Sequence, residues 1–287
     1  MAPVPPLYDG ARAVLATMHG KERAIAPLAA RFLGLTVEVP KGLDTDTFGT
    51  FSREVARSGT PLEAARAKIS AAFDLAPDAQ VGLASEGSFG PHPQVPFCAF
   101  GRELVVLIDR AGGLELVGHH GTMDTNFAHQ AVMDREAGLA FAAKAGFPEH
   151  GVIVMGMADG APAPNLALFK TIAAPADLAA ALDAAIARTG AAHIETDMRA
   201  HRNPRRMRAI KRAMIDLVRR ARSRCPECGR HGFAVTERLT GLPCRWCAAP
   251  TFLTRADILQ CAGCGHREER AMAAALADPM YCEECNP

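Results

Sequence analysis

The chain has 287 residues, 49% of them hydrophobic, and its 32 Lys and Arg nearly balance its 31 Asp and Glu. This length suits one large domain with a smaller appended one, and leaves the oligomeric state open. No apolar run reaches the roughly 18 residues that a membrane-spanning helix needs, and residues 1–10 lack the pattern of a signal peptide. Composition therefore argues against a membrane partner and predicts a cytoplasmic protein.

The near-neutral total conceals three segments of different charge. Residues 1–198 hold 15 Lys and Arg against 22 Asp and Glu, residues 199–224 hold 11 against 1, and residues 225–287 hold 6 against 8. These net charges of −7, +10 and −2 divide the chain into the domains that we expect. They are an α/β domain at 1–198, a basic connecting helix at 199–224 and a zinc-binding module at 225–287.

Short apolar runs typical of strands alternate with helical periodicity in residues 1–198. This alternation predicts an α/β fold, with a mixed sheet and flanking helices. The expected strands are Ala13–Thr17, Thr36–Val39, Gln80–Ala84, Leu104–Asp109, Leu114–Val117, Val152–Met155, Leu166–Thr171 and His193–Glu195. The expected helices are Glu22–Leu33, Pro61–Phe73, Ala131–Ala145, Ala176–Arg188 and, in the basic segment, Pro204–Arg222.

Polar residues gather where the first predicted strands end. A lysine that follows a glycine at the start of a helix suits a phosphate group, and small residues around a glutamate let a ligand approach the backbone closely. The candidate substrate-binding residues are His19, Gly20, Arg57, Lys68, Ser85, Gly87 and Ser88, and the candidate catalytic residues are Lys21, Glu63 and Glu86.

Phosphoanhydride cleavage is the chemistry that these residue types would serve. Mg²⁺ prefers one or two carboxylates together with phosphate oxygens, and Glu63 and Glu86 supply such carboxylates. Lys21, Arg57 and Lys68 would neutralise the phosphate charge. The helix that begins at Pro61 is equally consistent with an exposed charged surface. Asp44 and Asp46, in the loop before this helix, are consistent either with solvated carboxylates or with ligands of Mg²⁺.

Several motifs resemble a bacterial family known only as a domain of unknown function. They are T-M-H-G-K-E at 17–22, D-T-D-T-F-G-T-F at 44–51, L-A-S-E-G-S-F-G-P-H-P at 83–93, and the cysteine pairs described below. This resemblance covers nearly the whole chain and implies no activity.

The layout of the first 120 residues is similar to the inosine/xanthosine triphosphate pyrophosphatase superfamily. The resemblance rests on the turn at 19–22, the E-A-A-R-A-K helix at 63–68 and the acidic Glu86. It implies that Lys21 contacts phosphate, that Glu63 is a metal ligand, and that Glu86 is a metal ligand or the general base. The chain departs from that superfamily in lacking an asparagine in the first turn and in having one acidic residue, Glu86, where the superfamily has a pair.

The basic segment 199–224 contains Asp216 as its only acidic residue, and an apolar stripe runs along the predicted helix. One interpretation docks this helix on the acidic first domain. The other has it contact phosphates of RNA or DNA. The polar stretch before it places Glu195, Asp197, Arg199 and His201 either in the same cleft as the candidate site or at the helix start, with Asn203 as N-cap.

Eight cysteines form four C-x-x-C pairs in residues 225–287. Such pairs are typical of four-cysteine zinc sites, which leave no open coordination position and are structural. We expect two Zn²⁺ sites in a double zinc ribbon, with neighbouring pairs joined in sequence; the alternative joins the first pair to the third and the second to the fourth. The expected small core includes Phe233, Ile258, Trp246 and Phe252. The ligands are Cys225, Cys228, Cys244, Cys247, Cys261, Cys264, Cys282 and Cys285.

These features favour a Mg²⁺-dependent nucleotide-binding protein, specifically a nucleoside phosphate hydrolase or pyrophosphohydrolase that carries structural zinc. The partner would be a nucleotide or another phosphorylated small molecule. The alternative is a zinc module that binds nucleic acid or protein, with the α/β domain as a scaffold.

Overall fold

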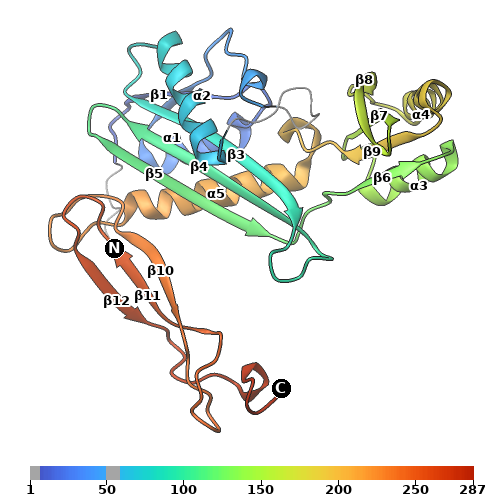
Figure 1. Ribbon diagram of the computed structural model, residues 1–287. Helices are drawn as coiled ribbons and strands as arrows, with labels where there is room; N and C mark the ends of the chain where they lie inside the picture. The colour runs from blue at the N-terminus through green and yellow to red at the C-terminus, as the bar shows by residue number, and fades with distance from the viewer. Residues whose placement is uncertain (1–6, 50–58) are drawn as a thin grey trace. The chain divides into compact units, whose positions relative to one another are not determined.

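The computed structural model describes residues 7–49 and 59–287, which fall into two compact units, one ending at Val218 and the other beginning at Arg219 (Figure 1). The first unit contains two sheets where a single mixed sheet was expected. None of the described helices has the length and apolar content needed to cross a membrane.

The larger sheet of the first unit is mixed and has five strands in the order β2-β1-β3-β4-β5. β1 is parallel to both of its neighbours. β3, β4 and β5 form an antiparallel meander, whose last turn is at residues 110–113. The strands are β1 (Arg12–Ala16), β2 (Thr36–Glu38), β3 (Val81–Pro91), β4 (Ala99–Asp109) and β5 (Leu114–Thr122).

The central strands are longer than the sequence predicts, which corrects the expectation that Glu86 follows a strand. β3 continues through the Gly-Ser-Phe-Gly stretch to Pro91, and it stays paired with β4 over its whole length. The glycines and prolines there look like a loop in sequence, but the β4 partner satisfies their backbone groups. Glu86 therefore lies in the middle of a paired strand.

Helices α2 (Pro61–Leu75) and α5 (Pro204–Arg222) cover opposite faces of this sheet. Gly82 on β3 faces Ile69 and Phe73 of α2. Gly118 on β5 lies against the backbone of α5. Gly118 pairs with Val105 of β4, and Val105 pairs in turn with Ser85 of β3, so the three residues form one row across the sheet. Because side chains alternate along a strand, Gly82 and Ser85 belong to different faces. Helix α1 (Glu22–Leu33) follows β1.

The smaller sheet is antiparallel, in the order β6-β9-β7-β8, and packs on two helices. Its core joins Val152, Val154 and Ile194 of the strands to Phe141 and Leu182 of the helices. The elements are β6 (His129–Val132), α3 (Arg135–Ala145), β7 (Val152–Ala158), β8 (Ala161–Phe169), α4 (Pro175–Thr189) and β9 (Ala192–Thr196).

The start of α3 differs from the predicted helix, which began at Ala131. Ala131 and Val132 belong to β6 instead. Asp134 then accepts a hydrogen bond from the backbone N–H of Ala137 at 2.8 Å, so it is the N-cap of α3. Asp134 could have marked this boundary in the sequence.

The second unit is built on a three-stranded antiparallel sheet in the order β10-β11-β12. Its small core consists of Phe233, Leu259 and two cysteines, Cys225 and Cys261, with Val235 packed beside them. The strands are β10 (Ala234–Thr240), β11 (Thr254–Gln260) and β12 (Arg267–Ala271).

We predict that Gly118→Ala destabilises the first unit by about 3 kcal/mol, because the added methyl group would overlap the backbone of Ala213 and Leu217 in α5. Gly90→Ala on β3 is the matched control, since no atom lies within 4 Å of the position of its Cβ. Urea unfolding followed by circular dichroism measures both. Equal midpoints for the two variants would contradict this packing of α5 on β5.

Candidate functional site

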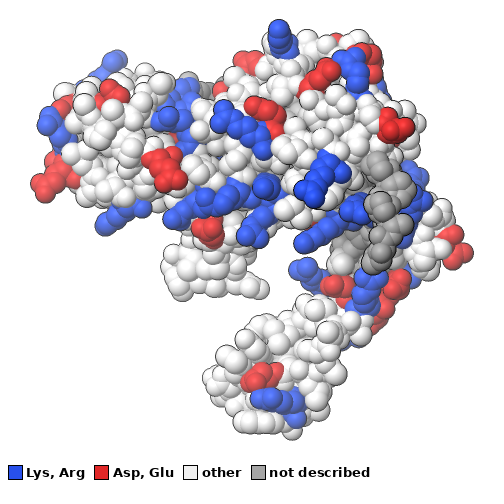
Figure 2. Space-filling model, turned by 180° about the vertical axis from the view of Figure 1, so that it is seen from behind, with Lys and Arg blue, Asp and Glu red and all other residues white. Residues whose placement is uncertain are grey.

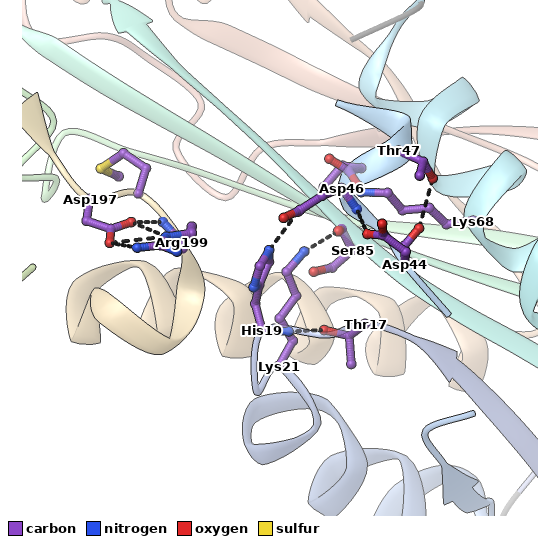
Figure 3. A network of polar contacts seen from close by, with 12 residues as sticks. Thr17, His19, Lys21, Asp44, Asp46, Thr47, Lys68, Ser85, Asp197 and Arg199 are labelled. Carbon is purple, nitrogen blue, oxygen red and sulfur yellow. Dashed lines mark hydrogen bonds and ion pairs between the residues drawn. The ribbon is translucent and has the colours of Figure 1, made fainter. Parts of the chain in front are cut away.

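A pocket in the first unit lies where β1 stops and β3 continues. Ala16, the last residue of β1, pairs with Ala84, and beyond that point β3 has no β1 residue beside it. The turn that follows β1 occupies this position, and Lys21 Nζ donates a hydrogen bond to the Ser85 carbonyl at 2.5 Å (Figure 3). The pocket is lined by Ala16, Thr17, His19, Lys21, Thr45, Asp46, Gly49, Lys68, Glu86, Arg199 and Arg206.

Lys21 is a buried lysine, with 6% of its surface exposed. No described residue forms an ion pair with it within 4 Å, and its one hydrogen bond is to a neutral carbonyl. Burial, and then the charge of Arg206, lowers the pKa of Lys21 to about 8. An anion in the pocket would supply the counter-charge that the protein does not place at hydrogen-bonding distance.

Lys68 and Glu86 form a buried ion pair in the lining of the pocket. Lys68 comes from α2, Glu86 from the α2 face of β3, and the Lys68 ammonium donates directly to Glu86 Oε1. Both side chains are less than 10% exposed. Glu86 is thus held in place by a cation, and the two residues together add no net charge to the pocket.

Arg206 and Arg199 reach the pocket from the segment around the start of α5. Arg206 Nε donates to Glu103 Oε1 at 2.7 Å, and both side chains are 1% exposed. Arg199 donates from Nη2 to Asp197 Oδ2 at 2.7 Å and to the Lys170 carbonyl at 2.7 Å. Each guanidinium is therefore oriented by a carboxylate that lies outside the pocket lining.

His19 and Asp46 form the remaining polar pair of the pocket wall. The His19 ring donates from Nε2 to Asp46 Oδ1 at 3.0 Å and stacks on the ring of His201, with centroids 5.2 Å apart. Burial lowers the pKa of His19 although Asp46 opposes the shift, and burial and Arg199 lower the pKa of His201. Both imidazoles are consequently neutral at pH 7.

Positive charge exceeds negative charge among the lining residues. Four cations, Lys21, Lys68, Arg199 and Arg206, face the pocket together with two carboxylates, Asp46 and Glu86. A cavity that concentrates cations out of bulk water attracts anions strongly.

The structure brings together most of the residues that the sequence singled out. His19, Lys21, Lys68 and Glu86 line the pocket, and Ser85 contributes its carbonyl. Gly20 allows the preceding turn, with φ of 70°. Gly87 packs against the side chains of Glu103 and Arg206.

Two of the predicted residues lie elsewhere, and a third is not described. Ser88 lines a separate cavity with Phe100 and Arg102. Arg57 is outside the described residues. Glu63 is not among the pocket residues: its carboxylate accepts hydrogen bonds from the backbone N–H and hydroxyl of Thr60, at 2.7 and 2.9 Å. These bonds complete a capping box at the start of α2 and lower the pKa of Glu63.

Arg206 is the pocket residue that sequence reasoning missed. A signal for it existed, because Arg206 falls on the same helical stripe as Ile210, Ala213 and Leu217, all of which are buried. An arginine on an apolar stripe needs a buried partner, which here is Glu103. Asn203 accepts a hydrogen bond from the backbone N–H of Arg206 at 3.0 Å and is the N-cap of α5, as the sequence suggested.

The eight paired cysteines of the second unit form two clusters, and their pairing corrects the sequential arrangement that we expected. Cys225 and Cys228 meet Cys261 and Cys264, while Cys244 and Cys247 meet Cys282 and Cys285. The first pair thus joins the third, and the second joins the fourth. This is the cross-braced alternative, and the second unit is not two zinc ribbons in tandem.

Both clusters have the dimensions of a tetrahedral zinc site. The Sγ–Sγ distances are 3.7 Å for Cys225–Cys264 and 3.9 Å for Cys244–Cys285, close to the roughly 3.8 Å that four Zn–S bonds of about 2.3 Å impose. Within the first cluster the pKa of the Cys261 thiol is lowered to about 6 by backbone N–H groups, whereas that of Cys264 is raised to about 12, so the four thiols do not ionise alike without a metal ion.

The length of the strands explains the crossed pairing. β10 separates the first pair from the second, and its seven residues span roughly 23 Å when extended. The antiparallel register, Ala234↔Gln260, brings the end of β11 back to the start of β10. The third pair, which follows β11 directly, therefore meets the first pair, and the second and fourth pairs lie toward the other end of the sheet.

Two aromatic residues expected in the core of this module are on its surface. Trp246 is 74% exposed and Phe252 is 63% exposed. Phe252 contacts Tyr281 edge to face, with ring centroids 5.9 Å apart. The core of this module consists instead of Phe233, Leu259 and the neighbouring Cys225 and Cys261.

Residues 68–287 match a family model described as a domain of unknown function (DUF6671). Because the match covers most of the chain, the protein belongs to this family. The matched region includes the cysteine clusters, α5, and the pocket residues Lys68, Glu86 and Arg206, whereas the turn that carries His19 and Lys21 precedes it. A comparison with curated proteins finds no match.

We predict that Cys225→Ala combined with Cys261→Ala removes one of two bound Zn²⁺ ions, because both substitutions fall in the same cluster. Cys225→Ala combined with Cys244→Ala should remove both ions, because it damages each cluster. Elemental analysis of zinc per chain, after dialysis against a weak chelator, measures the difference. Sequential pairing would reverse the two results.

Proposed function

We propose that this member of the DUF6671 family binds a nucleotide through its phosphate groups in the pocket beyond β1. The observation that carries the proposal is the buried Lys21, which has a lowered pKa and no carboxylate within ion-pairing distance among the described residues. Leaving a buried ammonium without a counter-ion costs free energy, and a bound phosphate would recover it.

Each cation around Lys21 has a separate part in this proposal. Glu103 fixes the guanidinium of Arg206, and Asp197 fixes that of Arg199. Because both side chains are already ordered, binding of a phosphate would cost little additional side-chain entropy. Lys68 adds a donor next to Glu86. Together they would hold phosphate oxygens in one orientation.

The proposal extends to hydrolysis of the phosphoanhydride, as the resemblance to the inosine/xanthosine triphosphate pyrophosphatase superfamily suggests. Glu86 and Asp46 are the carboxylates of the pocket, and Mg²⁺ prefers such a pair together with phosphate oxygens. In this scheme Asp46 replaces Glu63 as the second carboxylate, because the capping box occupies Glu63. When bound, Mg²⁺ would neutralise phosphate charge, and Glu86 would accept the proton of the attacking water.

We predict that nucleoside triphosphates stabilise the wild-type protein against heat, and more so with Mg²⁺. At a ligand concentration of about 100 times Kd the gain is about 2.7 kcal/mol, or roughly 5–10 °C in Tm. Lys21→Ala should abolish the shift. Lys144→Ala, an exposed lysine on α3, should retain it.

The same panel separates binding from turnover. Glu86→Gln should still be stabilised by nucleotide but should release pyrophosphate or phosphate about 10²–10⁴-fold more slowly than wild type. If no nucleotide, phosphate or pyrophosphate changes the Tm of the wild-type protein, the proposed function is wrong.

We further predict that nucleotide binding is linked to the protonation of Lys21. In the free protein the pKa of Lys21 is about 8, below the value of about 10.4 that it has in the unfolded chain. The folded protein therefore binds the Lys21 proton more weakly than the unfolded chain does, and its free energy of unfolding rises as pH increases from about 8. A bound phosphate reverses this preference and raises the pKa.

At pH 8 Lys21 is about half protonated in the free protein, so binding there should take up about half a proton. The terminal phosphate, with a pKa of about 6, is already almost fully ionised at this pH. Calorimetry in buffers of different ionisation enthalpy measures the uptake. Affinity should fall by up to about tenfold per pH unit above pH 8. An affinity that does not change between pH 8 and pH 10, or binding by the wild-type protein without proton uptake, would contradict the contact between Lys21 and phosphate.

A further inference from the structure

A second groove of the first unit runs between α1 and the start of α5. Its rim is formed by Arg23 of α1, His201, and Arg208 and Lys211 of α5. Its floor is apolar and consists of Ala24, Ala200, Pro204 and Met207. The groove therefore combines a cationic rim with a surface on which a flat apolar group can rest.

The cations of this rim lack acidic neighbours. Arg23, Arg208 and Lys211 are exposed, and within residues 7–49 and 59–287 none of them forms an ion pair. The helix that carries two of them, α5, contains Asp216 as its one acidic residue, and Asp216 accepts a hydrogen bond from the His119 backbone. Figure 2 shows Lys and Arg side chains gathered along this face.

The groove adjoins the phosphate pocket across a single pair of rings. His19 lines the pocket, His201 lines the groove, and the two imidazoles stack with centroids 5.2 Å apart. Lys21 and Arg23 are two residues apart at the start of α1. Lys21 lines the pocket, and Arg23 lines the groove. A ligand that extends out of the pocket over these rings would enter the groove.

We propose that the groove binds a single-stranded nucleic acid whose terminal phosphate occupies the pocket. This inference rests on the proposed function and specifies its ligand as a phosphorylated strand rather than a mononucleotide. The rim cations would contact the next phosphates, and the apolar floor with His201 would hold a base or sugar. Arg208 and Lys211 are about 4.5 Å apart along the axis of α5, so they present two charges in line, and the exposed Arg212 continues the row.

The test is fluorescence anisotropy with a single-stranded thymidine octanucleotide that carries a 5′-phosphate and a 3′ dye. A 5′-hydroxyl strand and a strand with the dye and the phosphate exchanged identify the end that is read. Thymidine monophosphate and triphosphate, as competitors, report on the pocket alone. The proposal predicts that the phosphorylated octanucleotide binds at least tenfold more tightly than either mononucleotide or the hydroxyl strand.

The groove variant is Arg208→Gln with Lys211→Gln, both exposed positions that α5 tolerates without repacking. Loss of two phosphate contacts should weaken octanucleotide binding about 25-fold at about 0.1 M salt and reduce the salt slope by about 1.4. Mononucleotide binding should be unchanged. The matched control is Lys144→Gln with Arg188→Gln, which removes the same charge from exposed positions on α3 and α4.

Each contrary result points to a different error. If the groove variant binds the octanucleotide like wild type, or if mononucleotides bind as tightly as the octanucleotide, the groove inference is overturned and the pocket proposal stands. If the hydroxyl strand binds as well as the phosphorylated one, the terminal phosphate does not occupy the pocket and the arrangement is wrong. If neither mononucleotides nor octanucleotides bind, both proposals fail.

Discussion

The buried ion pair between Arg206 and Glu103 is the contact on which the architecture of the first unit depends. It joins α5 to the middle of the large sheet, and both side chains are almost completely removed from water. Removal of either partner would leave an uncompensated buried charge, at a cost of about 3–5 kcal/mol. Because Arg206 also donates to the Met198 carbonyl and its backbone N–H meets Asn203, the same residue fixes the approach of α5 to the pocket. One guanidinium therefore serves the fold and the proposed site together.

Much of the pocket could be predicted from local sequence, because the residues concerned lie on, or next to, two neighbouring parallel strands. The His-Gly-Lys turn follows β1, Glu86 lies on the next strand of the sheet, and Lys68 is on the helix that packs against that strand. Glu63 looked equally suitable, but the Thr-Pro-Leu-Glu pattern before it is a capping box, and local hydrogen bonds settle its position. Arg206 arrives from far along the chain: the apolar stripe of α5 marks it as buried, but only tertiary packing against Glu103 decides that it reaches this pocket.

The cysteines illustrate the same boundary between local and non-local information. C-x-x-C spacing identifies each pair, since two thiolates three residues apart turn toward one point. Which pairs meet depends on the strands between them. Sequence reading assumed that chain neighbours close on each other, whereas an unbroken strand such as β10 carries consecutive pairs to opposite ends of the sheet. The surface position of Trp246 follows from the same geometry, because the turn between its two flanking cysteines lies on the outside of a metal cluster.

The crossed pairing also means that the order of synthesis differs from the order of closure. The first cluster joins Cys225 and Cys228 to Cys261 and Cys264. Cys244 and Cys247 lie between these two pairs in the chain, so they leave the ribosome before the first cluster is complete. During that interval the first two pairs already offer a complete set of four thiolate ligands for one ion. Formation of the β10–β11 hairpin places these two pairs at opposite ends of the sheet. A metal ion that reaches the chain early therefore meets four sulfurs that the folded module divides between two clusters.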